Sequence, residues 1–124
     1  MKLHADQASH SSVQAHGLGW ISVGGEKIGH SVVLTPDGGH APWGCARFGD
    51  LQAVHFEQLL THEPELVIFG SGLKLRFPHP SMHVALIAKR VGLETMDTLA
   101  ACRTYNILAQ EGRRVVAALI LETP

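Results

Sequence analysis

Short apolar runs separated by glycine and proline turns fill the first third of the chain and predict strands. Residues 19–23 and 26–28 flank the dipeptide Gly24-Gly25. Because adjacent glycines supply the positive φ angles of a tight two-residue turn, this pattern predicts an antiparallel hairpin. Residues 30–35 continue in strand character until the turn sequence Pro36-Asp37-Gly38-Gly39 ends the strand.

The middle of the chain changes from helical to strand-like periodicity. Apolar residues recur at helical spacing over residues 51–62, and Pro64 closes that segment because helices usually stop before a proline. Residues 66–69 form a continuous apolar run that ends at Gly70. Such a run is typical of a strand covered on both faces, so we expect it at the centre of a sheet.

Two further helices and a last strand are expected in the second half. One helix begins at Pro80 and ends at Gly92, and its predicted apolar stripe consists of Val84, Ile87, Ala88 and Val91. The next helix has Asp97 as its N-cap and runs to about Gln110. Residues 115–121 form the last strand.

Strands that alternate with helices imply parallel pairing through crossovers, whereas the opening hairpin implies an antiparallel edge. The predicted fold class is therefore α/β, a single domain whose mixed β-sheet has an N-terminal antiparallel hairpin and helices packed on it in three layers. Residues 1–16 alternate His, Ser, Gln and Asp without a sustained period, so we expect a loosely ordered N-terminal arm there unless the segment pairs with the sheet. The α/β domain then spans residues 17–124.

Composition and charge narrow the possible functions. The 124 residues have a formal net charge of −1, which excludes the positive field that non-specific nucleic-acid binding requires. The longest apolar stretch, residues 115–121, is far too short to cross a bilayer, and the first residues lack a signal-peptide run. We therefore expect a soluble, cytoplasmic protein without membrane insertion, in which Cys45 and Cys102 are free thiols.

Gly70-Ser71-Gly72 directly follows the apolar strand, where an α/β protein places loops whose bare backbone approaches a ligand. The dinucleotide pattern would need a third glycine where Leu75 stands, and no Gly-Lys-Ser/Thr sequence is present. Two interpretations stay open, a glycine turn needed for tight packing and a loop that binds an anion or other ligand.

The helix after Asp97 has a polar stripe of Arg103, Asn106 and Gln110. This stripe is either an ordinary solvated face or a contact surface for a partner or a small anion. Together with the loop, these patterns give the candidate binding residues, which are Gly70, Ser71, Gly72, Asp97, Arg103 and Asn106.

No complete catalytic or metal-ligating pattern is present. His79 and His83 are the only histidines four apart, and Pro80 separates them. Ser71 lacks the flanking glycines of a nucleophile elbow, and no base is fixed by sequence near Cys102. We therefore expect no catalytic residue, no metal site and no cofactor.

Several segments together resemble one family. They are residues 64–72 (PELVIFGSG), Met96-Asp97-Thr98, residues 100–106 (AACRTYN) and Glu111-Gly112-Arg113. The chain resembles the Mth-domain family of unknown function, which includes a mitochondrial factor that helps to assemble respiratory complex I. One departure is Ser71, where relatives often carry threonine. The resemblance implies a small α/β domain with no established reaction, and a role in assembly or protein interaction.

Two functions follow as hypotheses. The first is a non-enzymatic binding or assembly module, related to complex I assembly factors, with an unidentified protein partner. The alternative is a small-molecule or anion-binding protein or enzyme that uses the Gly70-Ser71-Gly72 loop. A homodimer is also predicted, because Trp20 and Trp43 lie in the strand-rich first half, although both indoles could instead fill the core.

Overall fold

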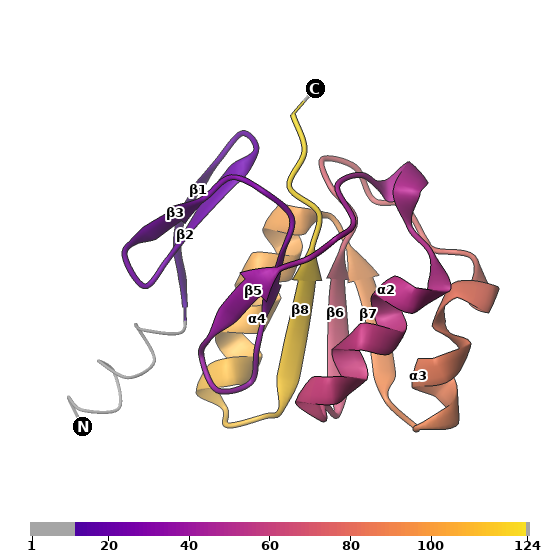
Figure 1. Ribbon diagram of the computed structural model, residues 1–124. Helices are drawn as coiled ribbons and strands as arrows, with labels where there is room; N and C mark the ends of the chain where they lie inside the picture. Colours follow the sequence, from indigo (N-terminus) through magenta and orange to yellow (C-terminus); the bar gives the residue numbers. More distant parts are fainter. Residues whose placement is uncertain (1–11, 124) are drawn as a thin grey trace.

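A mixed sheet forms the centre of the computed structural model, which describes residues 12–123 (Figure 1). The five-stranded sheet has the order β5-β4-β8-β6-β7, with β5 at His40–Pro42, β4 at Val32–Leu34, β8 at Val115–Leu119, β6 at Leu66–Gly70 and β7 at Gly92–Met96. β6 pairs in parallel with β7 and β8, whereas β4 pairs antiparallel with β5 and β8. The predicted mixed α/β fold is confirmed.

A second, three-stranded sheet lies beside the first. Its strands are β1 (Val13–Gly17), β2 (Trp20–Val23) and β3 (Glu26–Ile28). The predicted hairpin is β2–β3, and its turn glycines Gly24 and Gly25 both have positive φ. Both sheets contribute buried side chains to one hydrophobic cluster, so the hairpin is part of the same domain.

The end of the segment expected as an arm over residues 1–16 pairs with a sheet, which was the alternative for it. Residues 1–11 lie outside the described part of the chain, but Val13–Gly17 is strand β1, which pairs antiparallel with β2. The side chain of Asn106 holds this strand, since it accepts from Val13 N at 2.8 Å and donates to Val13 O at 3.0 Å. The local sequence does not predict this strand, because Asn106, the residue that bonds it, lies 93 residues farther along the chain.

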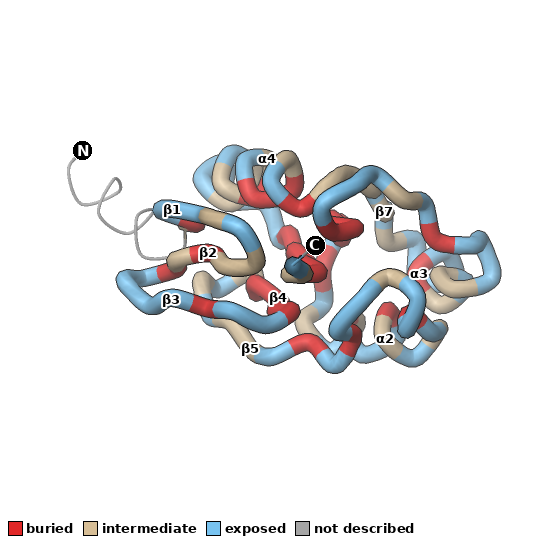
Figure 2. The backbone as a smooth tube through the Cα atoms, turned by 90° about the horizontal axis from the view of Figure 1, so that it is seen from above, coloured by how far each residue is buried: buried red, intermediate tan, exposed pale blue. Residues whose placement is uncertain are grey.

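Helices cover both faces of the large sheet, which gives the three layers (Figures 1 and 2). α4 (Thr98–Gln110) packs on one face, with its Tyr105 hydroxyl donating to Thr35 O at 2.8 Å. The other face carries the short helical segments η1 (Phe48–Asp50), α2 (Ala53–Glu57), η2 (Gln58–His62), η3 (Pro80–His83) and α3 (Val84–Ala88). Strands β6 and β8 are buried throughout.

Three details of the sequence prediction are wrong. The centre of the sheet is β8, and β6 lies next to it. The expected helix over residues 51–62 divides into α2 and the 3-10 segment η2. In α3, the stripe residues Val84, Ile87 and Ala88 are exposed and Leu86 is buried, because the helical register restarts at His83, whose backbone is not helical (φ −119°, ψ 28°).

The two tryptophans have different environments. Trp43 is in the core, where its ring packs edge-on against Phe69 and its Nε1 donates to His55 O at 3.1 Å. Trp20 is half-buried, and the ammonium of Lys27 lies 4.6 Å from the centroid of its indole ring. For Trp43, therefore, the core interpretation is the correct one.

Both cysteines are buried free thiols. Burial raises the pKa of Cys102 to about 12 and that of Cys45 to about 11. Neither thiol therefore has the thiolate character of a nucleophile.

We predict that Asn106→Ala removes the anchor of β1. The N–H and C=O groups of Val13 lose their partners, so amide exchange at Val13 should accelerate and the free energy of unfolding should fall by about 1–3 kcal/mol. Arg103→Ala is the matched control, because Arg103 is exposed on the same helix and such a change should stay within about 0.5 kcal/mol. Equal stability of the two variants, measured by urea denaturation, would contradict this role of Asn106.

We also predict that both thiols resist alkylation in the folded protein. At about pH 8 a thiol with a raised pKa is almost entirely protonated, so iodoacetamide should react slowly until denaturant exposes the side chains. Mass spectrometry of the alkylated chain, with and without urea, measures this difference. Rapid labelling of Cys102 without denaturant would show that α4 opens readily.

Candidate functional site

The glycine loop packs tightly between β6 and the beginning of α4. A Cβ atom added to Gly70 would lie 2.9 Å from Leu119 Cδ2 and 3.1 Å from the Cα atom of Thr98. A larger residue there would require the Leu119 side chain and the first residue of α4, Thr98, to shift. At Gly70, therefore, the packing interpretation accounts for the glycine.

Ser71 organises the loop that follows. Its buried hydroxyl donates to Lys74 O at 2.6 Å and accepts from Arg76 N at 3.0 Å. A second oxygen, Met96 O, lies 3.3 Å away. The Ser71 hydroxyl thus bonds only backbone groups of the loop and of β7, and these bonds account for a serine at position 71.

Thr98 joins the loop to the end of the sheet. Its buried Oγ1 donates to Ile120 O at 2.7 Å and accepts from Gly72 N at 2.9 Å. Thr98 is also the first residue of α4, whose N-cap Asp97 accepts from Ala100 N at 3.0 Å. One hydroxyl therefore fixes the segment after β8, the loop after β6 and the start of α4 relative to one another.

The carboxylate of Glu122 lies against the backbone of the loop at Gly72 and Leu73. Its Oε2 accepts from Leu73 N at 3.1 Å and lies 3.4 Å from Arg76 Nη1. Gly72 has a φ of +108°, and an added Cβ would collide with this carboxylate. The backbone that was a candidate anion cradle thus already holds an anion from its own chain.

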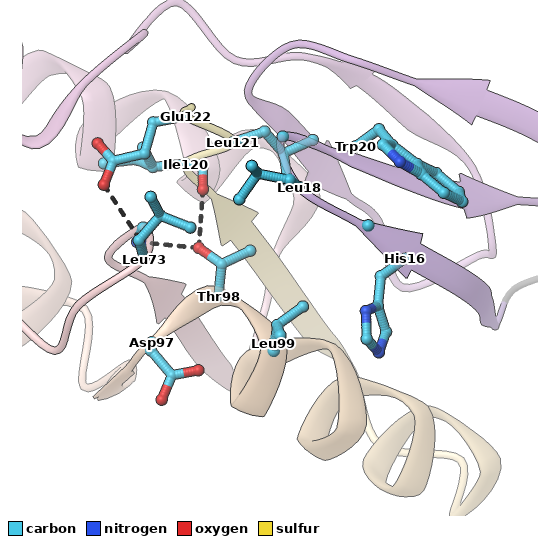
Figure 3. Close-up of a pocket in the computed structure, with 13 residues that line it drawn as sticks. His16, Leu18, Trp20, Leu73, Asp97, Thr98, Leu99, Ile120, Leu121 and Glu122 are labelled. Atoms are coloured by element: carbon cyan, nitrogen blue, oxygen red, sulfur yellow. Dashed lines mark hydrogen bonds between the residues drawn. The ribbon is translucent and has the colours of Figure 1, made fainter. Parts of the chain in front are cut away.

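A cavity of about 310 Å³ opens beside this loop, between the two sheets (Figure 3). Its walls come from the β1–β2 turn, the loop after β6, the first turn of α4 and the segment after β8, and the lining residues are His16–Trp20, Gly72, Leu73, Asp97–Leu99 and Ile120–Glu122. Leucine side chains remain accessible at its mouth, with Leu18 61%, Leu73 47% and Leu99 41% exposed. The cavity is therefore apolar and open to solvent.

The predicted site residues divide among different places. Gly72 and Asp97 line the cavity, and Gly70 and Ser71 are not lining residues. Arg103 and Asn106 are not lining residues either, since Arg103 is exposed farther along α4 and Asn106 is bonded to β1. Of the six candidate binding residues, the cavity thus contains Gly72 and Asp97, and a binding role for any of the six stays a prediction.

Most of the lining was not among the candidate residues, including the β1–β2 turn, Thr98 and Glu122. Glu122 could be placed beside the loop only once β8 was known to pair with β6, because parallel strands end at the same edge of the sheet. Residues 120–122 must then lie beside residues 70–72. Within residues 12–123, no group of three or more His, Cys, Asp or Glu side chains is arranged to hold a metal ion.

We predict that Thr98→Val destabilises the protein more than Thr98→Ser. Valine leaves the Ile120 carbonyl and the Gly72 N–H without their buried partner, which should lower the free energy of unfolding by about 2–4 kcal/mol. Serine keeps the hydroxyl and loses one methyl group, so its cost should be about 1 kcal/mol. Urea denaturation of both variants measures the difference, and equal losses would show that the hydroxyl contributes little.

Comparisons with known proteins agree with this fold. A crystal structure of a Bordetella parapertussis protein superposes with a TM-score of 0.84 at 39% identity, covering 90% of this chain and 95% of that one. The solution structure of a Bordetella pertussis protein described as an Mth938-like domain has a TM-score of 0.82 at 32% identity and covers 94% of this chain and 88% of that one. The resemblance to the Mth-domain family is confirmed.

A curated relative points to the same family. The mouse (Mus musculus) protein named NADH dehydrogenase (ubiquinone) 1 alpha subcomplex assembly factor 3 is 32% identical over 102 residues, which are 81% of this chain and 55% of the relative. The chain thus spans little more than half the length of that protein. A family model matches residues 13–120, and the chain therefore belongs to the family described as protein of unknown function (DUF498/DUF598).

Proposed function

We propose that this protein is a binding module that docks a protein partner at the cavity between the β1–β2 turn and the start of α4. The observation that carries the proposal is the cluster of exposed leucines, Leu18, Leu73 and Leu99, around an apolar cavity. Exposed apolar patches next to a hollow are typical of interaction surfaces. The relative named as an assembly factor supports a role in protein assembly.

The side chains around the cavity support binding over catalysis. The hydroxyls of Ser71 and Thr98 are both engaged with backbone groups. The nearest cysteine on α4, Cys102, is buried and protonated. A partner-binding surface needs no activated nucleophile, so the proposal accounts for this arrangement without a reaction.

A second candidate function is small-molecule binding in the same cavity. Its volume, about 310 Å³, falls within the range of ligand pockets. The glycine loop is a poor cradle for a small anion, because Glu122 already accepts from Leu73 N. A ligand would therefore bind mainly through apolar contacts, and a thermal-shift screen of metabolites tests this candidate.

The remaining expectations about partners belong to the same proposal. The net charge of −1 supports a protein partner over nucleic acid. The prediction of a homodimer rests on Trp20 alone, since Trp43 fills the core, and light scattering tests it.

No helix within residues 12–123 is long and apolar enough to cross a membrane. A cytoplasmic location stays a prediction, which cell fractionation checks.

The test of docking uses Leu99→Gln with Ile107→Gln as its matched control. Both residues are exposed on α4, but Ile107 lies outside the cavity. In affinity capture from the source organism, Leu99→Gln should reduce recovery of the specific partner by about tenfold, the effect of losing an apolar interface anchor. Ile107→Gln should leave recovery unchanged. Equal recovery by both variants would overturn docking at this cavity.

A further inference from the structure

A second hollow opens where the chain runs from the loop after β6 toward α3, at the end of the molecule away from the three-stranded sheet (Figure 1). Its volume is about 380 Å³, and its lining includes Phe48, Leu51, Phe77 and Met82. Leu51 is buried in a core cluster against which Phe48 and Met82 pack, so the floor of the second hollow is apolar. It shares no lining residue with the cavity beside the glycine loop.

Phe77 projects from the edge of this second hollow, with 70% of its surface exposed. The chain on both sides of Phe77 is held in place. Before it, Arg76 N donates to the buried hydroxyl of Ser71, and Arg76 Nη1 lies 3.4 Å from Glu122 Oε2. After it, Pro78 is buried. The phenyl ring is therefore presented to solvent from a fixed backbone, and exposed aromatic side chains of this kind are typical of interfaces.

The second hollow has room for another phenyl ring. A closed apolar cavity of about 150 Å³ holds a benzene molecule, and the second hollow is more than twice as large, at about 380 Å³. Because Phe77 is itself one of the lining residues, a projecting ring and a hollow that accepts one lie side by side on the same surface. Two copies that face each other across a two-fold axis can therefore exchange both rings at once, and such an interface closes at a dimer.

The charges around the second hollow do not select a charged partner. They are balanced by two ion pairs, Arg47 with Asp50 at 3.9 Å and Arg76 with Glu122 at 3.4 Å. Lys74 and His79 are the remaining basic side chains of the loop between β6 and η3. The whole chain has a net charge of −1, so long-range repulsion between two copies is small. This balance favours a second copy over an acidic protein or an anionic membrane surface.

We propose that the protein self-associates as a two-fold dimer in which the Phe77 ring of each copy enters the second hollow of the other. Each ring exchanges solvent for an apolar lining, which stabilises the dimer. A contact surface of this size gives a weak dimer that forms at high protein concentration. The inference is independent of docking at the cavity. It gives the predicted homodimer a contact surface that does not include Trp20.

Sedimentation velocity of the full chain at increasing concentration tests the dimer. The unmodified protein should shift from monomer to dimer as its concentration rises. Phe77→Ser removes the projecting ring, and Gly49→Leu fills the second hollow, since Gly49 is a lining residue. A Cβ atom added to Gly49 meets nothing within 4 Å, so the fold accommodates the leucine. Each variant should self-associate at least about tenfold more weakly, the effect of losing an aromatic anchor.

Gly44→Leu is the matched control for Gly49→Leu. A Cβ atom added to Gly44 also meets nothing within 4 Å, and Gly44 is not a lining residue of the second hollow. Gly44→Leu should therefore dimerise as the unmodified protein does.

Mixing the two variants tests the reciprocal exchange. The Gly49→Leu chain keeps its phenyl ring, and the Phe77→Ser chain keeps its hollow. A mixed pair therefore regains one of the two contacts that neither variant makes with itself. An equimolar mixture should associate more strongly than either variant alone, whereas misfolded variants would gain nothing from being mixed.

The possible results separate this inference from the other proposals. A chain that stays monomeric at every concentration, or a mixture that associates no better than its components, would overturn the inference. A monomer that instead sediments with anionic lipid vesicles through Phe77 would also overturn it. A dimer that survives both Phe77→Ser and Gly49→Leu would overturn it too, and the homodimer predicted from Trp20 would then still stand. Docking at the cavity is tested separately by Leu99→Gln.

Discussion

The architecture around the cavity depends on one buried hydroxyl, that of Thr98. It bonds the carbonyl of Ile120 after β8 and the N–H of Gly72 after β6, and it belongs to the first residue of α4. A buried polar group without a partner costs about 1–3 kcal/mol. Because both backbone groups rely on the same oxygen, the three segments have one favourable arrangement. The positions of Leu99 and Glu122 at the cavity follow from it.

This arrangement also occupies the backbone N–H groups of the glycine loop. A glycine loop at the carboxyl end of a parallel strand is a common place for a phosphate or carboxylate. The glycine loop of this protein lies at that place after β6, but the carboxylate bound there is that of Glu122 from the same chain. Glu122 in turn forms an ion pair with Arg76. The N–H groups of Gly72 and Leu73 are therefore both bonded within the chain, to Thr98 Oγ1 and to Glu122 Oε2.

The sequence predicted the elements whose causes are local. The hairpin follows from Gly24-Gly25, α4 begins at its N-cap Asp97, and β6 follows from a continuous apolar run. The features that the sequence did not predict depend on contacts between residues far apart along the chain. Strand β1 is held by Asn106, and Glu122 reaches Leu73 only because β8 pairs with β6, a choice that no local pattern encodes. Of the six candidate residues, only Gly72 and Asp97 therefore line the cavity.

The polar residues of α4 illustrate why a shared helix face is a weak guide to shared function. Asp97, Arg103 and Asn106 appear together in the sequence as one candidate surface, yet each meets a different environment. Asp97 lines the cavity, Arg103 faces solvent, and Asn106 serves both backbone groups of Val13 on an edge strand. Unpaired strand edges invite association with other chains. Asn106 of α4 occupies that edge and so holds the small sheet in place. The β1–β2 turn of this sheet forms one wall of the cavity, and the first turn of α4 forms another.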